Sequence, residues 1–126
     1  MPRTVLIVDD DPLTVDQFAR MLRLEGYHVV AASDGAEGLQ QALLTRPDAM
    51  ILDLRMPIID GAALLEQFRS VSQLRDVPAV IVTGDYSLDE ATLDRLRALG
   101  AQVQYKPLWI DDLVGIVNTL LRIEKA

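Results

Sequence analysis

Four segments of this sequence end in side chains that could bind a metal ion or an anion. The segments at 5–8, 49–52, 79–82 and 103–105 are followed by Asp9-Asp10-Asp11, Asp53, Thr83 and Lys106, respectively. If the segments are parallel strands, their carboxyl ends lie along one edge, where open α/β sheets bind ligands. Three carboxylates (Asp9, Asp10 and Asp53), a hydroxyl and an ammonium gathered there would make a site for Mg²⁺ and a phosphoryl group.

The adjacent acids at 9–11 need more explanation than a helix cap. Asp11 precedes Pro12 and can cap a helix, and a solvated loop would account for the rest. Three neighbouring carboxylates repel one another, however, and a hard cation would relieve that repulsion. Mg²⁺ prefers oxygen ligands and often uses one or two carboxylates together with a phosphate. We therefore expect Asp9 and Asp10 to bind the metal.

Asp53 is the candidate nucleophile, although it could also be only a solvent-exposed strand end. A carboxylate can attack phosphorus and form an acyl phosphate, and the transfer depends mostly on positioning and electrostatics. Lys106 can pair with a phosphate oxygen, and Thr83 can donate one hydrogen bond. Gly84 leaves room beside Thr83.

Strand and helix patterns alternate five times along the chain. The expected strands are 4–8, 28–32, 48–53, 78–83 and 102–105, and the expected helices are 12–25, 35–45, 60–73, 88–99 and 109–124. Alternation of this kind predicts parallel strands joined by right-handed crossovers. We expect an α/β fold: a flavodoxin-like, doubly wound five-stranded sheet in the order 2-1-3-4-5, with five helices in a single domain.

Local signals support the helix ends. In the first helix, Pro12 lies in the first turn, Gly26 follows the end, and Val15, Phe18, Ala19 and Leu22 form a core stripe. The segment Ser87-Leu88-Asp89-Glu90 has capping-box spacing and predicts the start of the fourth helix.

Composition limits the possible functions. The chain has 126 residues, half of them apolar, a net charge of −7 and no cysteine. We expect one domain over 1–126, either stand-alone or the N-terminal part of a longer regulator. The acidic balance argues against nucleic-acid binding by this segment. We see no signal peptide and no segment approaching the roughly 18 apolar residues of a membrane span, so a cytoplasmic location is expected.

The chain resembles the receiver domain of two-component response regulators, and the resemblance covers essentially all of it. The matching motifs are Val8-Asp9-Asp10-Asp11-Pro12, Asp53-Leu54-Arg55-Met56-Pro57 with Asp60-Gly61, Val82-Thr83-Gly84 and Lys106-Pro107. Any one of these motifs is weak evidence, but the ordered set is highly specific.

The resemblance implies that Asp53 accepts a phosphoryl group from a phosphohistidine on a sensor histidine kinase or a histidine phosphotransfer protein. It implies that Asp9, Asp10, Asp53 and the backbone carbonyl of Arg55 hold Mg²⁺. Thr83 and Lys106 would contact the phosphoryl oxygens. The chain would be a signalling switch rather than an enzyme. Phosphorylation would bias the surface of the fourth helix, fifth strand and fifth helix toward a homodimer, an output domain or an effector.

One position departs from the family. Many members carry Tyr or Phe on the fifth strand two residues past a Gly-Ala pair, where this chain has Val103. Tyr105 lies two residues later. Either the domain signals with a smaller rearrangement, or an aromatic from elsewhere substitutes, with Tyr86 and Trp109 as candidates. Leu108 also stands where the family often has Phe.

Three residues flank the expected site. We hypothesise that Arg55 and Asp85 form an ion pair across its mouth, which would hinder an attacking water and slow dephosphorylation. Pro107 would follow a cis peptide bond that aims Lys106 inward. His28, the only histidine, lies away from the acids, and we expect it to be a surface residue.

The last helix has a wide apolar face, for which two explanations stay open. One explanation is generous core packing, and the other is an exposed edge for a dimer or an effector, formed by Trp109, Ile116, Leu120 and Ile123.

Two other functions use some of the same residues. A haloacid-dehalogenase-type phosphatase would use Asp9 as nucleophile, Asp11 as acid/base and Asp111-Asp112 for metal, but it would leave Asp53 unused and the chain has no room for a cap domain. A scaffold that is never phosphorylated would not need the intact acid set.

Overall fold

The computed structural model describes residues 2–108 and 110–125, and for residues 110, 111 and 123–125 it describes the backbone alone. In this part of the chain, five parallel strands form one sheet in the predicted order β2-β1-β3-β4-β5. The strands are β1 (Thr4–Val8), β2 (His28–Ala32), β3 (Ala49–Asp53), β4 (Ala79–Thr83) and β5 (Ala101–Tyr105). The helices are α1 (Pro12–Leu24), α2 (Gly35–Thr45), α3 (Gly61–Ser70), α4 (Glu90–Ala98) and α5 (Ile110–Lys125). Within the described residues, no helix combines the length and the apolar character that crossing a membrane requires.

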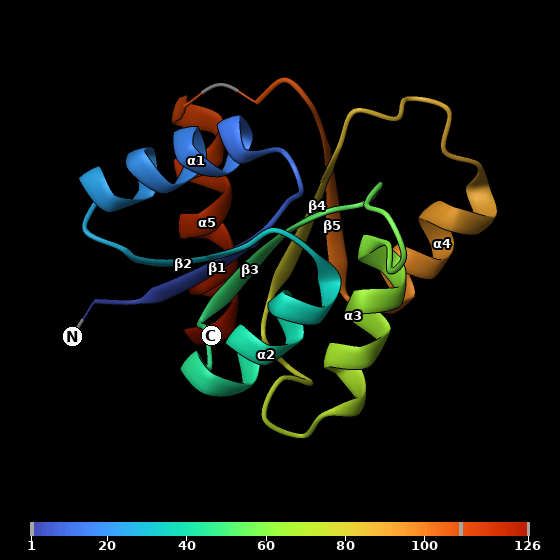
Figure 1. The fold of residues 1–126 in the computed structure, drawn as a ribbon, viewed down its shortest axis with the longest axis horizontal. Helices are drawn as coiled ribbons and strands as arrows, with labels where there is room; N and C mark the ends of the chain where they lie inside the picture. Colours follow the sequence, from blue (N-terminus) through green and yellow to red (C-terminus); the bar gives the residue numbers. More distant parts are fainter. Residues whose placement is uncertain (1, 109, 126) are drawn as a thin grey trace.

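The helices cover both faces of the sheet. α1 and α5 lie on one face, and α2 and α3 lie on the other, with α4 beside β5 (Figure 1). Successive strand residues point to opposite faces, so Val5 packs toward α1 and α5 whereas Leu6 packs toward α2 and α3. Because both faces are covered, β3 and β4 are buried at every position. This explains why their sequences are apolar almost without interruption.

Aspartates cap the first four helices. The side chains of Asp11, Asp34, Asp60 and Asp89 accept hydrogen bonds from the backbone N–H groups of Leu13, Glu37, Ala63 and Thr92, respectively. The cap of α1 is therefore as predicted. The capping box at Ser87 is wrong, because the Ser87 hydroxyl and N–H both donate to Asp85 and α4 begins two residues later than expected.

The structure decides part of the question about α5. Leu113, Val117, Leu120 and Leu121 are buried in the core between α5, α1 and the sheet. The expectation that Leu120 belongs to an exposed edge is therefore wrong, because its place on the helix repeat turns it toward the sheet. Ile116 is half-buried and packs against the same core. Trp109 and the side chain of Ile123 lie outside the described residues.

A partly buried arginine joins two loops at the amino edge of the sheet. The Arg69 guanidinium donates to the carbonyls of Leu74, Arg75 and Val77 before β4, and to that of Leu99 before β5. Burial lowers the pKa of Arg69. Carbonyls left without partners in such loops would cost stability, so this one side chain stabilises the ends of α3 and α4 together.

A glycine lets α3 approach the carboxyl end of β3. A Cβ built on Gly61 would lie 2.3 Å from the carbonyl oxygen of Asp53 and 3.0 Å from the Cα of Leu54. The Gly61 N–H also donates to the Leu54 carbonyl at 2.8 Å. The first turn of α3 therefore packs directly on the backbone that carries the Asp53 side chain.

We expect Gly61→Ala to lower the free energy of unfolding by about 2–3 kcal/mol, because backbone atoms on both sides must move apart. Gly115→Ala is the matched control. A Cβ at Gly115 in α5 meets nothing within 4 Å, so there the change should stabilise by up to about 1 kcal/mol. Urea unfolding of both variants measures the difference, and equal effects at the two positions would contradict the packing argument.

Candidate functional site

Strand register brings the chemically active residues to one row. Val8 pairs with Leu52, Asp53 with Val82, and Thr83 with Tyr105. Asp9, Asp53, Thr83 and Lys106 therefore sit at or just past the ends of adjacent strands. This is the edge of the sheet at which the sequence predicted a site.

Three carboxylates form a cluster at this edge. One oxygen from each of Asp9, Asp10 and Asp53 lies within 4.8 Å of the other two. Asp9 and Asp53 are buried, with 4% and 7% of their surface exposed, whereas Asp10 faces solvent. The N–H of Asp11 donates to Asp9 Oδ1 at 2.9 Å, which fixes that carboxylate. Hard oxygen donors at this spacing suit a divalent cation such as Mg²⁺.

The ammonium of Lys106 bridges the two buried acids. Its Nζ lies 3.1 Å from Asp9 Oδ2 and 3.4 Å from Asp53 Oδ1. The Lys106 N–H donates to the Thr83 carbonyl at 2.8 Å, so the end of β5 is tied to the end of β4. The peptide bond between Lys106 and Pro107 is cis, in agreement with the sequence-based hypothesis.

Burial and neighbouring charge shift the protonation of this site. Burial, together with the negative charge of Asp9, raises the pKa of Asp53 to about 6, although the nearby Lys106 opposes the rise. Burial alone would lower the pKa of Lys106, but its hydrogen bond to Asp9 and the charges of Asp9 and Asp53 raise it overall. The lysine therefore stays charged while the carboxylate is poised near neutral pH.

Thr83 is fully buried beside the cluster, and its hydroxyl oxygen accepts a hydrogen bond from the Asp85 N–H at 3.0 Å. A hydroxyl that accepts one hydrogen bond keeps its proton for another acceptor. Gly84 follows, and a Cβ built there would meet nothing within 4 Å, so the space beside Thr83 is open.

The ion pair between Arg55 and Asp85 is present. Arg55 Nε and Nη2 lie 3.0 and 2.8 Å from Asp85 Oδ2. The other oxygen of Asp85 accepts from the hydroxyl and the N–H of Ser87. Hydrogen bonds from Ser87, reinforced by Arg55, lower the pKa of Asp85 to about 2. The pair connects the loop after β3 to the loop after β4.

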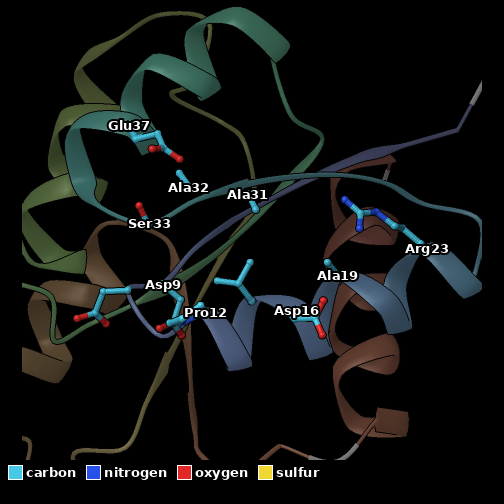
Figure 2. A pocket seen from close by; sticks show the side chains of 11 residues that line it. Asp9, Pro12, Asp16, Ala19, Arg23, Ala31, Ala32, Ser33 and Glu37 are labelled. Atoms are coloured by element: carbon cyan, nitrogen blue, oxygen red, sulfur yellow. The ribbon is translucent and has the colours of Figure 1, made fainter.

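A cavity opens beside the acidic cluster. It has a volume of about 430 Å³ and lies between α1 and the end of β2, with Asp9 and Asp10 at one end. Figure 2 shows Arg23 of α1 at the end remote from Asp9, and Ser33 and Glu37 on the side opposite Pro12 and Asp16. The cavity therefore adjoins the cluster at Asp9 and Asp10, and Asp53 does not line it.

Tyr86 and Tyr105 form an aromatic pair beside Lys106 that the sequence indicated only in part. Val103, at the position where the family often has an aromatic residue, is partly buried and packs against the core. The rings of Tyr86 and Tyr105 stack on each other next to Lys106. The available signal was their position, since one tyrosine follows Thr83 by three residues and the other directly precedes Lys106.

Comparison with known proteins gives consistent results. The family model described as the response regulator receiver domain matches residues 5–118. The transcriptional regulatory protein PrrA of Mycobacterium leprae is 40% identical over 121 residues, which cover 94% of this chain and 49% of that protein. The response regulator MprA of the same organism is 35% identical, over 96% of this chain and 52% of that protein. The chain thus spans about half the length of these curated relatives.

Solved structures agree with the fold. The chemotaxis protein CheY4 of Vibrio cholerae superposes with a TM-score of 0.89 at 28% identity, over 96% of this chain and all of that one. A CheY-like response regulator receiver domain protein from Methanospirillum hungatei gives a TM-score of 0.91 at 25% identity, over 99% and 98% of the two chains.

The raised pKa of Asp53 predicts how the stability of the metal-free protein depends on pH. The folded state binds this proton more tightly than the unfolded state, with pKa values of about 6 and 3.8. Its contribution to stability is therefore present below about pH 4 and is lost as pH rises through about 6. We expect Asp53→Asn to stabilise the protein by on the order of 1–2 kcal/mol at about pH 7.5, and by much less at about pH 4.5.

Urea unfolding in the presence of a chelator at both pH values provides the test. Asp94→Asn is the matched control, since it removes the same charge from a carboxylate whose side chain is 71% exposed. If Asp53→Asn stabilised the protein equally at both pH values, or if Asp94→Asn gave the same gain in stability, the raised pKa would not belong to Asp53.

Proposed function

Because this chain belongs to the family of response regulator receiver domains, we propose that it is a phosphoacceptor switch in which Asp53 is phosphorylated. The donor is a phosphohistidine on a sensor histidine kinase or a histidine phosphotransfer protein. The observation that carries the proposal is the grouping at the sheet edge. The Asp53 carboxylate lies beside the Lys106 ammonium, and Asp9 and Asp10 complete the acidic cluster.

Asp9, Asp10 and Asp53 would hold Mg²⁺, with the backbone carbonyl of Arg55 as a further ligand. The three carboxylates fit that ion because their oxygens are close enough to share one cation and Asp10 is open to solvent. When bound, the ion supplies positive charge that offsets the repulsion between the acids and the incoming phosphoryl oxygens.

In the transfer, an oxygen of Asp53 attacks phosphorus. A P–O bond forms, the P–N bond of the phosphohistidine breaks, and the leaving imidazole keeps the bonding electron pair. Lys106 pairs with one phosphoryl oxygen and the Thr83 hydroxyl donates to another. Thr83 can do so because its oxygen already accepts from Asp85 and its own proton is available. The chain promotes only its own phosphorylation and dephosphorylation.

The phosphorylated site would act on the surface formed by α4, β5 and α5. β5 carries Lys106 at its end, and the loop between Thr83 and α4 contains Asp85 and Tyr86. A change at the phosphoryl site therefore reaches this surface within a few residues, and Ile116 on α5 belongs to its half-buried margin. A second copy of the domain, an output domain or an effector would bind there.

The phosphatase alternative has less support. Asp11 is occupied as the cap of α1, and both oxygens of Asp9 already accept hydrogen bonds, from the Asp11 N–H and from Lys106. Asp112 is exposed on α5. The matched proteins are regulators rather than phosphatases.

The first test is phosphorylation itself. Incubation of the wild-type chain with Mg²⁺ and a small phosphodonor such as acetyl phosphate should add one phosphoryl group, which peptide mass spectrometry places on Asp53. Asp53→Asn should abolish the label and Asp94→Asn should retain it. Omission of Mg²⁺ should reduce labelling at least tenfold, because the charge on the acids then repels the donor. Label on Asp9, or steady hydrolysis without label, would refute the proposal and favour the phosphatase.

The second test concerns the Arg55–Asp85 ion pair, which we propose covers the site and hinders the attacking water. Arg55→Ala and Asp85→Ala should each shorten the lifetime of the phosphorylated form by about two- to fivefold, as expected for an exposed pair of modest strength. Loss of label with time, followed by intact-protein mass spectrometry, gives the lifetime. Arg95→Ala is the control, since it breaks an exposed ion pair with Glu66 on the α3–α4 surface. Unchanged lifetimes in both variants would show that the ion pair does not shield the phosphorylated site from water.

A further inference from the structure

Tyr86 and Tyr105 form an aromatic pair directly beside the site. Their ring centroids are 5.4 Å apart and their planes differ by 20°. Tyr86 lies in the loop after β4 and is 68% exposed, whereas Tyr105 ends β5 and is 37% exposed. Neither ring is in the core, so core packing does not explain the arrangement. The stack joins the loop that follows Thr83 to the last residue of β5, which directly precedes Lys106.

The hydroxyl of Tyr86 extends the connection to Lys106 itself. It donates a hydrogen bond to the Lys106 backbone carbonyl. The Lys106 N–H donates to the Thr83 carbonyl at 2.8 Å. Both backbone polar groups of Lys106 are therefore held by β4 and the loop that follows it.

This attachment matters because Lys106 lies beyond the last residue of β5. Its N–H is bonded to the Thr83 carbonyl of β4, and its own carbonyl has the Tyr86 hydroxyl as its partner. A lysine side chain has several rotatable bonds, and movement at its Cα is carried to the ammonium. That ammonium lies at 3.1 and 3.4 Å from Asp9 and Asp53, distances that small backbone shifts would change.

We propose that Tyr86 is a positioning residue for Lys106. Its hydroxyl fixes the Lys106 carbonyl, its ring fixes the preceding Tyr105, and together they set the point from which the ammonium reaches Asp9 and Asp53. The proposal rests on the proposed function, since it assigns Lys106 to the phosphoryl oxygens. Tyr86 itself does not touch the reacting atoms.

Removing one tyrosine hydroxyl at a time distinguishes the positioning of Lys106 by Tyr86 from simple packing of the loop. Tyr86→Phe keeps the ring and removes only the hydroxyl that bonds to Lys106. Tyr105→Phe is the matched control, because it removes the same atom from the other ring, whose hydroxyl forms no hydrogen bond within the described part of the chain. Both substitutions keep the two aromatic rings that form the stack.

The main experiment is a double-mutant cycle on the rate of Asp53 phosphorylation by acetyl phosphate with Mg²⁺. Tyr86→Phe should slow phosphorylation by about three- to tenfold, the range that one hydrogen bond supports, whereas Tyr105→Phe should not. In a Lys106→Ala background, Tyr86→Phe should have no further effect, because the group that it positions is gone. Equal slowing in both backgrounds, or no slowing in either, would overturn the proposal.

Two further measurements keep the result specific. The affinity for Mg²⁺ alone should be the same in Tyr86→Phe and wild type, because Asp9, Asp10 and Asp53 are untouched, and a matching loss would indicate general damage instead. NMR relaxation of the Lys106 side-chain methylenes in the unphosphorylated protein should show greater motion in Tyr86→Phe than in Tyr105→Phe. Equal motion would also overturn the proposal.

The NMR measurement separates this inference from the proposed function. If the wild-type chain does not accept a phosphoryl group on Asp53, the proposed function fails, and the relaxation data still decide whether Tyr86 holds Lys106. If the wild type is phosphorylated and the Tyr86→Phe and Tyr105→Phe variants behave alike, only the positioning role fails.

Discussion

The ammonium of Lys106 lies between two buried carboxylates that would otherwise repel each other across the edge of the sheet. Asp9 follows β1 and Asp53 ends the neighbouring β3, and the parallel pairing of these strands holds the two backbone segments side by side. Like charges at this spacing in a partly desolvated site are costly, and Asp10 adds a third charge nearby. The lysine offsets part of that cost, while the raised pKa of Asp53 shows that a part remains. The repulsion that remains between the acids is the electrostatic reason for the site to bind a further cation.

Much of this arrangement could be predicted from the sequence because it depends on local patterns. Continuous apolar segments such as Val5–Val8 occur where both faces of a sheet are covered, and their ends fix where Asp9, Asp53 and Thr83 must lie. The alternation of strands and helices then limits the topology to a few orders. Asp11 and Gly26 mark the limits of α1 for similarly local reasons. Once the strands are taken as parallel and in register, the positions of these residues at the strand ends predict that they lie close together.

The features that the sequence did not predict depend on a choice between competing local partners or on contacts between distant segments. Ser87 has the spacing of a helix cap, but its hydroxyl is taken by Asp85, and Asp89 caps α4 instead. The wide apolar face of α5 did not show which residues meet the sheet, so core packing and an exposed edge both stayed open for Leu120, which the structure buries. The hydrogen bond from Tyr86 to the Lys106 carbonyl joins positions 20 residues apart, and no periodicity indicates it.

The hydrogen bonds of Arg69 anchor one end of α4 and leave its other end to different contacts. They join the loops before β4 and β5 at the amino edge of the sheet, opposite the acidic cluster, and Arg95 pairs with Glu66 between α4 and α3 on the same side of the sheet. The C-terminal end of α4 is thereby clamped, whereas its N-terminal end is connected through the exposed loop of Tyr86 and Ser87. The two ends of α4 thus have different attachments: backbone carbonyls bound by an arginine at the end remote from the site, and an aromatic stack in the loop at the end that adjoins it.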